Sequence, residues 1–273
     1  MWVGFGVARK IKKVTVKANS NIEEEIVRVT VGESGTLTWL GHATVLLTTH
    51  AGTRIMFDPW LDGNPKSPVG LADVGVVDAI AVTHGHFDHV GSVASLARAC
   101  EATVICVPEM AAYFSSIGVT NVVEMNKGGT VRVAEVSLTM VTADHSCGIS
   151  LVENAPYAYG GNPVGFIVGL ADDEGGPIYL SGDTNVFGDM ALIRELYAPE
   201  IALIPIDGHY NMGPREAAHA VKLLGVKRVV PIHYGTFEIL AGTPEELRSH
   251  LAKAGSSTAL FAIEPGQSVS LTP

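Results

Sequence analysis

The chain has 273 residues and a formal net charge of −10, with 47% apolar and 17% charged residues. This apolar content excludes a disordered chain, because disordered sequences are poor in apolar residues. The acidic balance argues against a general polyanion-binding protein, which uses a basic surface. The sequence has no uncharged apolar run near the ~18 residues that a membrane-spanning helix needs, so no membrane span is expected.

The N-terminal region differs in composition from the rest of the chain. Residues 1–22 contain five basic side chains and no acidic one. We predict that residues 1–34 form an N-terminal extension or an extra edge strand, and that residues 35–273 form the main domain. Three cysteines are too few for a disulfide framework and indicate a reducing compartment. We expect the cytoplasm, with organelle targeting by the basic N-terminal arm as the alternative.

From residue 35 onward, strand patterns alternate with turn and helix patterns. Strands are predicted at Thr36–Leu40, Thr44–Thr49, Arg54–Phe57, Ala79–Thr83, Thr103–Val107, Val122–Glu124, Thr130–Val133, Val136–Thr142, Phe166–Leu170, Ile178–Leu180, Ile201–Ile206, Arg228–Ile232, Ala259–Ile263 and Val269–Leu271. Helices are predicted near Val90–Ala99, Glu109–Ile117, Met190–Leu196, Pro214–Leu224 and Pro244–Ala254. Residues 146–163 are expected to be a long connection, a kind of loop that is often functional. Two sets of strands, each followed by helices, predict an α/β layered fold with helices outside packed sheets.

A run of histidines follows the strand predicted at Ala79–Thr83. His84, His86, Asp88 and His89 fall within six residues. Imidazole and carboxylate groups are ligands of zinc and similar divalent metals, and ligands gather at strand ends in α/β folds. His84 and His86 alternate on an extended chain, so both can face one ion. Asp88 and His89 follow a turn and can face a second ion, so the run predicts a metal site with room for two ions.

Three more potential ligands also follow predicted strands. His145 comes after Val136–Thr142, Asp183 after Ile178–Leu180, and His233 after Arg228–Ile232. Taken singly, such residues are more typical of turns or of packed structural positions. Their shared position at strand ends suggests instead that several strands deliver one ligand each to one rim.

The histidine run, followed by isolated His, Asp and His residues, resembles the metallo-β-lactamase superfamily. The similarity is greatest to the branch that contains ascorbate-6-phosphate lactonase and N-acyl-phosphatidylethanolamine phospholipase D, and within it to small bacterial and archaeal metal-dependent hydrolases. The matching stretches, in chain order, are Leu40-Gly-His-Ala-Thr, Phe57-Asp-Pro-Trp-Leu, Thr83-His-Gly-His-Phe-Asp-His, Tyr159-Gly-Gly-Asn-Pro-Val-Gly-Phe, Ser181-Gly-Asp-Thr, His209-Tyr-Asn-Met-Gly-Pro and Pro231-Ile-His-Tyr-Gly-Thr-Phe. Residues 1–34 have no recognised counterpart.

The resemblance implies an αββα four-layer sandwich with its site at one edge, between the sheets. It also implies a ligand set for two metal ions. One ion is held by His84, His86 and His145, and the other by Asp88, His89 and His233, with Asp183 as the bridge between them. Zinc is the expected metal, with manganese, iron and nickel as alternatives for nitrogen and oxygen ligands.

Two such ions would lower the pKa of a shared water and give a hydroxide nucleophile near pH 7. We therefore expect a hydrolase that acts on a small ester, lactone or phosphoester, in which Asp88 or Asp183 takes the proton. A nuclease of the same fold is the alternative within enzymes, and the net charge of −10 argues against it. A non-hydrolytic metal-binding sensor or redox protein is the alternative outside hydrolases. The low charge fraction leaves room for a homo-oligomeric interface.

Five further residues are candidates for roles around the ligands. His42 is a candidate for orienting the substrate, and Tyr234 for donating to a developing oxyanion. Asp58 is expected to fix the tautomer of a ligand histidine. His209 and Tyr210 precede a predicted helix whose first N–H groups can receive an anionic group of the substrate. For each of them, a turn or packing role is the alternative interpretation.

Overall fold

We describe the fold from a computed structural model of the chain, which describes residues 35–150, 156–171 and 175–272. These residues all belong to Gly32–Pro273, one of the two compact units into which the chain divides. The extension or extra strand predicted for residues 1–34 lies outside the described residues. Within the described part of the chain, no helix is long and apolar enough to cross a membrane.

The first half of the described chain, together with one strand from its C-terminal end, builds a mixed β-sheet. Its seven strands, counted over the described residues, lie in the order β16-β1-β2-β3-β4-β5-β6, with antiparallel pairing from β16 to β3 and parallel pairing from β3 to β6. The strands are β1 (Thr36–Trp39), β2 (Val45–Thr48), β3 (Arg54–Phe57), β4 (Ala79–Ala81), β5 (Thr103–Cys106), β6 (Val122–Glu124) and β16 (Ser268–Ser270). The last strand thus returns to the first sheet and pairs with β1.

The second sheet also contains seven strands among the described residues, in the order β15-β14-β13-β12-β11-β8-β7. Its strands are β7 (Thr130–Val133), β8 (Val136–Thr142), β11 (Val164–Gly169), β12 (Ile178–Leu180), β13 (Ile201–Pro205), β14 (Arg228–Ile232) and β15 (Ala259–Leu260). Strands β12 to β15 are parallel, and β7, β8, β11 and β12 are antiparallel. The parallel strands place the segments that follow them at one edge of the sheet.

The side chains of the second sheet alternate between two hydrophobic cores. Phe166 and Val168 of β11 pack into the core shared with the first sheet, whereas Ile167 packs into the core beneath the outer helices. In β13, Leu203 faces the first of these cores and Ile204 the second. Because successive strand residues point to opposite faces, a strand that is covered on both faces is apolar throughout.

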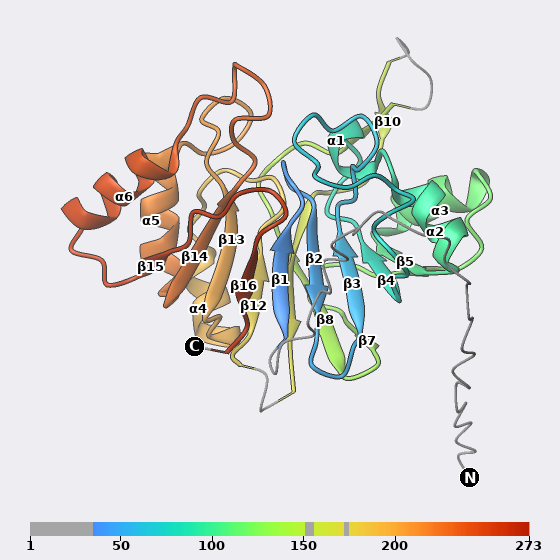
Figure 1. The fold of residues 1–273 in the computed structure, drawn as a ribbon, viewed down its shortest axis with the longest axis horizontal. Helices are drawn as coiled ribbons and strands as arrows, with labels where there is room; N and C mark the ends of the chain where they lie inside the picture. Colours follow the sequence, from blue (N-terminus) through green and yellow to red (C-terminus); the bar gives the residue numbers. More distant parts are fainter. Residues whose placement is uncertain (1–34, 151–155, 172–174, 273) are drawn as a thin grey trace, which may run out of the picture. The chain divides into compact units, whose positions relative to one another are not determined.

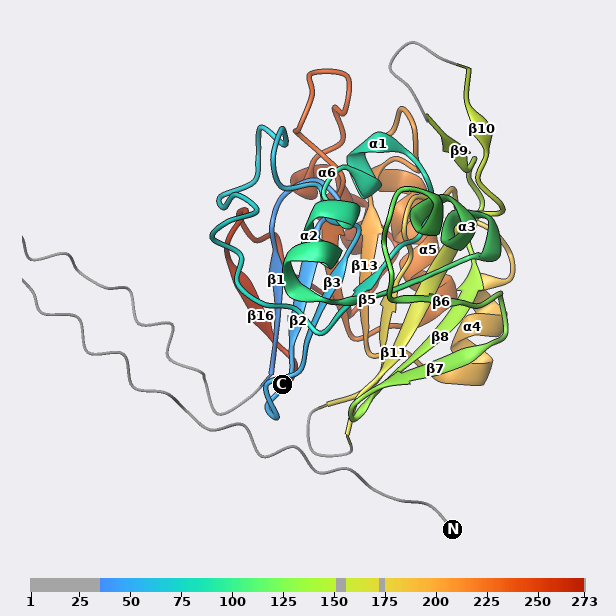
Figure 2. The same cartoon turned by 90° about the vertical axis from the view of Figure 1, so that its right-hand side faces the viewer.

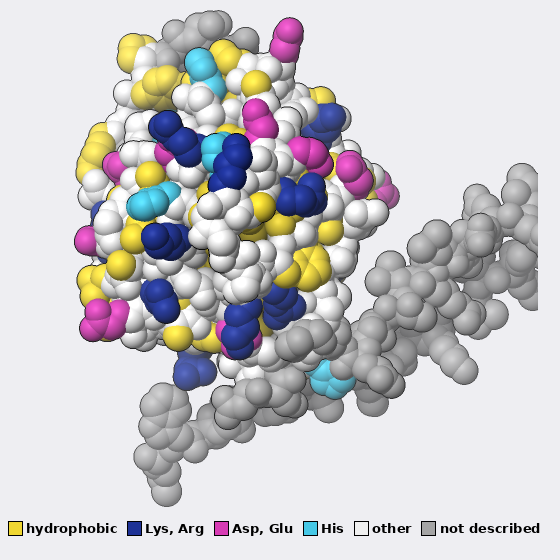
Figure 3. Space-filling view, turned by 90° about the vertical axis from the view of Figure 1, so that its left-hand side faces the viewer, with side chains coloured by type: hydrophobic (Ala, Val, Ile, Leu, Met, Phe, Trp, Pro, Cys, Tyr) yellow, Lys and Arg dark blue, Asp and Glu magenta, His cyan; other side chains and the backbone are white. Residues whose placement is uncertain are grey.

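Helices cover the outer faces of both sheets. They are α1 (Phe87–Val90), α2 (Val93–Cys100), α3 (Pro108–Ser116), α4 (Met190–Tyr197), α5 (Pro214–Leu224) and α6 (Pro244–Lys253). Helices α2 and α3 lie on the opposite side of the molecule from α5 and α6 (Figure 1, Figure 2). The Lys and Arg side chains spread over the outer face formed by α5 and α6 are visible in Figure 3. This arrangement confirms the predicted αββα sandwich.

Two details of the fold differ from the prediction. The segment 146–163, predicted to be a connection only, contains β9 (Gly148–Ile149) and β10 (Ala158–Tyr159), which pair antiparallel as a small separate sheet. The helical stretch predicted from Val90 begins three residues earlier and is split into α1 and α2, with Gly91 and Ser92 between them. Such short elements carry too little periodicity to be recognised from sequence.

Candidate metal centre

The structure brings all seven predicted ligands together at the edge where the parallel strands end, the upper edge in Figure 1. Three groups of donor atoms form there, each with all its atoms within 4.8 Å of one another, and the third, Asp58 with His84 and His89, shares its histidines with the other two. The first group is His84, His86 and His145, and the second is His42, Asp88, His89 and His233. Within the first, His84 Nε2 and His86 Nδ1 are 2.9 Å apart. The histidine run supplies two donors to each group, and sheet order adds His145 to the first and His42 and His233 to the second.

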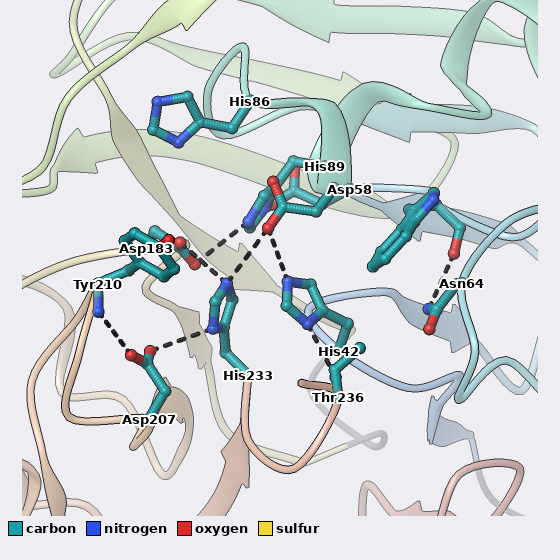
Figure 4. Close-up of polar contacts among 12 residues, drawn as sticks. His42, Asp58, Asn64, His86, His89, Asp183, Asp207, Tyr210, His233 and Thr236 are labelled. Atoms are coloured by element: carbon teal, nitrogen blue, oxygen red, sulfur yellow. Dashed lines mark hydrogen bonds and ion pairs between the residues drawn. The ribbon is translucent and has the colours of Figure 1, made fainter. Parts of the chain in front are cut away.

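Asp183, which follows β12, lies between the first two groups (Figure 4). Its Oδ1 is 3.3 Å from His89 Nε2, and its Oδ2 is 3.1 Å from His233 Nε2. The same Oδ2 is 3.7 Å from Nε2 of His145, which belongs to the first group. One carboxylate therefore reaches ligand candidates from both groups.

Several of these buried atoms lack a hydrogen bond, although they lie close to one another. Among the described residues, His89 Nε2, Asp183 Oδ1 and His233 Nε2 have no aligned hydrogen-bond partner. Buried polar atoms are nearly always hydrogen-bonded, so such a cluster needs an explanation. Nitrogen and oxygen atoms that converge without bonding each other form a donor set that suits divalent metal ions.

Asp58, at the end of β3, holds two of the candidate histidines in a fixed tautomer. Its Oδ2 is 2.8 Å from His89 Nδ1 and accepts a hydrogen bond of 2.6 Å from the Thr83 hydroxyl. Since that hydroxyl donates to Asp58, it accepts from His84 Nδ1, which is 3.0 Å away. Both Nδ1 atoms therefore carry the proton, and both Nε2 lone pairs are left for a ligand.

Asp207 is an important residue that the sequence analysis missed. Its Oδ2 is 3.1 Å from His233 Nδ1, and its Oδ1 accepts from the backbone N–H groups of His209, Tyr210 and Asn211. Asp207 therefore orients His233 and also fixes the loop that follows β13. It stands directly after a predicted strand, so the same strand-end rule that selected Asp183 would have found it.

Asp207→Asn is expected to weaken metal binding about 10- to 100-fold, which is the usual effect of losing a carboxylate behind a ligand histidine. The asparagine amide would donate to His233 Nδ1, so the proton would move to Nε2 and block that atom as a ligand. Metal affinity is measured by competition with a chromogenic chelator. Asp144→Asn, which changes an exposed aspartate beside His145, is the control. Unchanged affinity in Asp207→Asn would contradict this role.

His42 is fully buried in the turn between β1 and β2. Its Nε2 is 2.8 Å from Asp88 Oδ2, and its Nδ1 is 2.9 Å from the Thr236 hydroxyl. Burial lowers the pKa of His42 to about 4, so the ring is neutral at pH 7. A carboxylate only accepts, so Nε2 donates to Asp88 and Nδ1 accepts from Thr236. His42 thus holds the carboxylate of Asp88 in position within the second group of donors.

Backbone strain is concentrated at this site. His42, Asp58 and His233 have positive φ angles of 54°, 44° and 58°, a region that side chains other than glycine rarely adopt. Hydrogen bonds hold this conformation, because the His42 carbonyl accepts from His233 N at 2.9 Å and from Trp39 Nε1 at 2.8 Å. Such strain is typical of functional sites, where the surrounding structure keeps it in place.

The carboxylates and imidazoles shift one another's pKa values. Burial would raise the pKa of Asp183, but the imidazoles of His233 and His89 hold it well below its usual value. Burial would lower the pKa of His89, but the charges of Asp183 and Asp58 raise it to about 10. Asp183 is therefore ionised at neutral pH, and a bound cation would have to replace the proton on His89.

A cavity of about 570 Å³ opens above the donor atoms. Tyr210 lines it, as do the predicted ligands His86, Asp88, His145, Asp183 and His233. Tyr234 is not among the residues that line it, and its predicted oxyanion role stays a prediction. Its ring stacks on Trp39 with centroids 5.2 Å apart, and burial raises the pKa of its hydroxyl to about 12.

The anion site predicted at the start of α5 is already satisfied within the chain. The Glu216 carboxylate contacts the backbone N–H groups of Glu216 and Gly213, and the N–H groups of residues 209–211 bond to Asp207. His209 is exposed and packs edge-on against Tyr210, with centroids 4.6 Å apart, and it does not line the cavity. Neither His209 nor the helix start is therefore placed to receive an anion in the cavity.

Known proteins that are similar to this chain are named metal-dependent hydrolases, which agrees with a metal site here. Residues 53–234 match the β-lactamase superfamily domain. The chain is 47% identical over 231 residues to a UPF0173 metal-dependent hydrolase of Rubrobacter xylanophilus, covering 85% of this chain and 94% of the relative. It is 41% identical over 232 residues to a metal-dependent hydrolase of Methanopyrus kandleri, covering 85% and 98%.

A solved structure is also similar. It is a metallo hydrolase from the hyperthermophilic archaeon Ignicoccus hospitalis, with 31% sequence identity and a TM-score of 0.75 over 86% of this chain and 97% of that one. The chain matches these two relatives and this structure over nearly their whole length. The chain therefore belongs to the metallo-β-lactamase superfamily, and it is a metal-dependent hydrolase of that superfamily.

Proposed function

We propose that the chain hydrolyses a small ester, lactone or phosphoester with two divalent metal ions bound. The observation that supports this most strongly is the position of Asp183, which lies within 3.7 Å of histidines from both donor groups. A carboxylate shared in this way suits a pair of ions. Zinc is the expected metal, with manganese, iron and nickel as alternatives.

We assign His84, His86 and His145 to one ion and Asp88, His89 and His233 to the other, with Asp183 shared. The ions would supply a water of lowered pKa and would withdraw charge from the carbonyl or phosphoryl oxygen of the substrate. In the overall reaction, the hydroxyl of water joins the acyl or phosphoryl group, and the proton joins the departing alcohol. The protein residues position the substrate and transfer the proton from water to the departing alcohol.

Asp88 lines the cavity and is ionised at neutral pH. Burial would raise its pKa, but the neighbouring imidazole of His233 and the hydrogen bond with His42 hold the pKa far below its usual value. We assign Asp88 or Asp183 to accept the proton from water and to return it to the leaving group. His42 Nε2 would hold Asp88 Oδ2 throughout, because its own pKa of about 4 keeps the ring neutral.

Metal analysis of the purified protein, followed by assays with that metal restored, tests this proposal. We expect close to two equivalents of metal per chain, and turnover of carboxylic esters, lactones or phosphoesters that stops on chelation and returns with metal. Plasma mass spectrometry counts the metal, and a panel that includes RNA ranks the substrates. Turnover of RNA alone would favour the nuclease alternative over the small-molecule hydrolase.

His86→Ala is expected to remove the metal from the first donor group and to lower kcat/KM on the order of 100-fold or more, because electrostatic stabilisation at that ion is lost. His86 is only partly buried, so the variant should still fold. Metal content and kcat/KM are measured together on the best substrate. His219→Ala, which changes an exposed histidine of α5, is the matched control. Full activity with all metal retained in His86→Ala would contradict the assignment.

A further inference from the structure

The walls of the cavity differ sharply from its floor. The floor consists of the imidazoles and carboxylates described above. The walls are contributed mainly by apolar and aromatic side chains, namely Phe87, Tyr157, Tyr210, Phe237, Ile239 and Leu240. Ligand cavities commonly combine a few placed polar groups with such apolar walls. The reacting bond and the rest of a substrate would therefore meet different surroundings.

The apolar wall is braced from behind. The buried Trp60 ring lies 5.6 Å from Phe87 and 6.0 Å from Phe237, measured between ring centroids. It also packs edge-on against His42, 5.3 Å away. A Cβ atom at Gly91 would lie only 2.8 Å from the Trp60 ring, so the glycine leaves room for that ring. Phe87 and Phe237 are thus held as one surface although they are 150 residues apart in the sequence.

These wall side chains are also exposed to an unusual degree. Phe87 is 57%, Phe237 42% and Ile239 48% exposed. Leu240 is buried beside them. A contiguous group of exposed apolar side chains around a cavity usually marks a binding surface.

The described residues that line the cavity include no lysine and no arginine. Basic side chains are instead spread over the outer face of α5 and α6 (Figure 3), where Arg215 and Arg248 pair with glutamates. The metal ions of the proposed function would take up the charge of the reacting group. Among the described lining residues, no Lys or Arg would then remain to form an ion pair with a second negative charge on the substrate.

We propose that the part of the substrate beyond the reacting bond is an uncharged, apolar acyl or aryl group seated against Phe87, Phe237 and Ile239. This inference rests on the proposed function, because it takes the reacting bond to lie at the metal centre. It narrows the substrates of the proposed function to those with an apolar body beyond the reacting bond, and it excludes those that carry a further carboxylate or phosphate there.

Two substrates that differ in one group test the proposal on the metal-loaded protein. They are p-nitrophenyl hexanoate and the p-nitrophenyl monoester of adipic acid, which have the same reacting bond, leaving group and chain length. Only the end of the chain differs, a methyl group in one and a carboxylate in the other. We expect kcat/KM to be at least roughly tenfold higher for the hexanoate, because an unpaired charge is disfavoured against an apolar wall.

A charge-introducing variant locates the effect. Ile239→Lys should lower kcat/KM for the hexanoate roughly tenfold and raise it for the adipate monoester, because the ammonium group removes apolar contact and pairs with the carboxylate. Leu192→Lys is the matched control, since Leu192 of α4 is also 48% exposed and does not line the cavity. Leu192→Lys should leave kcat/KM for the hexanoate and for the adipate monoester the same as in the unsubstituted protein.

The outcomes separate this inference from the proposed function. Equal or better turnover of the adipate monoester by the unsubstituted protein would overturn the inference and leave the hydrolase assignment intact. If neither ester is turned over, the assignment to ester hydrolysis fails. Binding of 2-heptanone and of 6-oxoheptanoate, measured by ligand-observed NMR, then decides the inference alone. Tighter binding of 2-heptanone than of 6-oxoheptanoate, with this preference lost in Ile239→Lys, supports an apolar ligand. Equal binding of the two compounds overturns the inference.

Discussion

Asp183→Asn is expected to abolish metal binding at both donor groups and to lower kcat/KM on the order of 1,000-fold, which corresponds to about 4 kcal/mol of transition-state stabilisation. The carboxylate lies within 3.7 Å of His89, His145 and His233, so its charge is shared by ligands of both groups. An asparagine has nearly the same shape but no charge to share. The measurements are metal content and kcat/KM on the best substrate found.

Asp189→Asn provides the matched control for this variant. Asp189 precedes α4, is exposed, and makes no side-chain hydrogen bond to the helix start. The control should keep its metal and its activity. If Asp183→Asn retained two equivalents of metal and full activity, the carboxylate of Asp183 would have no part in the metal centre.

Asp58→Asn is expected to lower the free energy of unfolding by about 3 kcal/mol, since it removes the charged partner of a buried ion pair. It should also weaken metal binding roughly 10- to 100-fold. Asparagine tolerates the positive φ of 44° at this position, so the backbone is preserved. Its amide would donate to His89 Nδ1 and could no longer accept from the Thr83 hydroxyl. His89 would then carry its proton on Nε2, the atom that faces Asp183.

Denaturant unfolding of the metal-free protein separates the two parts of this prediction. A loss of stability there reports the buried pair itself, and chelator competition reports the metal affinity. Asp73→Asn, at an exposed aspartate in a turn, is expected to change neither quantity by more than experimental error. Stability and metal affinity both equal to those of the unsubstituted protein would show that Asp58 does not fix the histidines.

The histidine run illustrates why part of the site was predictable. His84, His86, Asp88 and His89 stand next to one another in the sequence, and imidazole and carboxylate chemistry needs no fold to be recognised. Asp183 and His233 followed from one further rule, that parallel strands end at a common edge. Asp207 satisfies the same rule, since it directly follows the strand predicted at Ile201–Ile206, but it was not among the predicted site residues.

Tyr234 shows that neighbours in the sequence can point in different directions. It stands next to His233, and adjacency suggested a role at the reacting atoms. Neighbouring residues at a strand end point in different directions, however. The His233 ring turns toward Asp183, whereas the Tyr234 ring turns away and stacks on Trp39. Sequence adjacency therefore says little about which side chain enters a cavity.

The sequence by itself determined the strand and helix pattern, an α/β layered fold and the residues that can hold metal, because periodicity and donor chemistry are local properties. The αββα class was implied by the resemblance to the metallo-β-lactamase superfamily. Only the tertiary structure decided the rest. It paired β16 with β1, placed Asp207 behind His233, and joined Phe87 to Phe237 across Trp60. These relations depend on long-range strand order and on side-chain direction, and no local pattern encodes either of them.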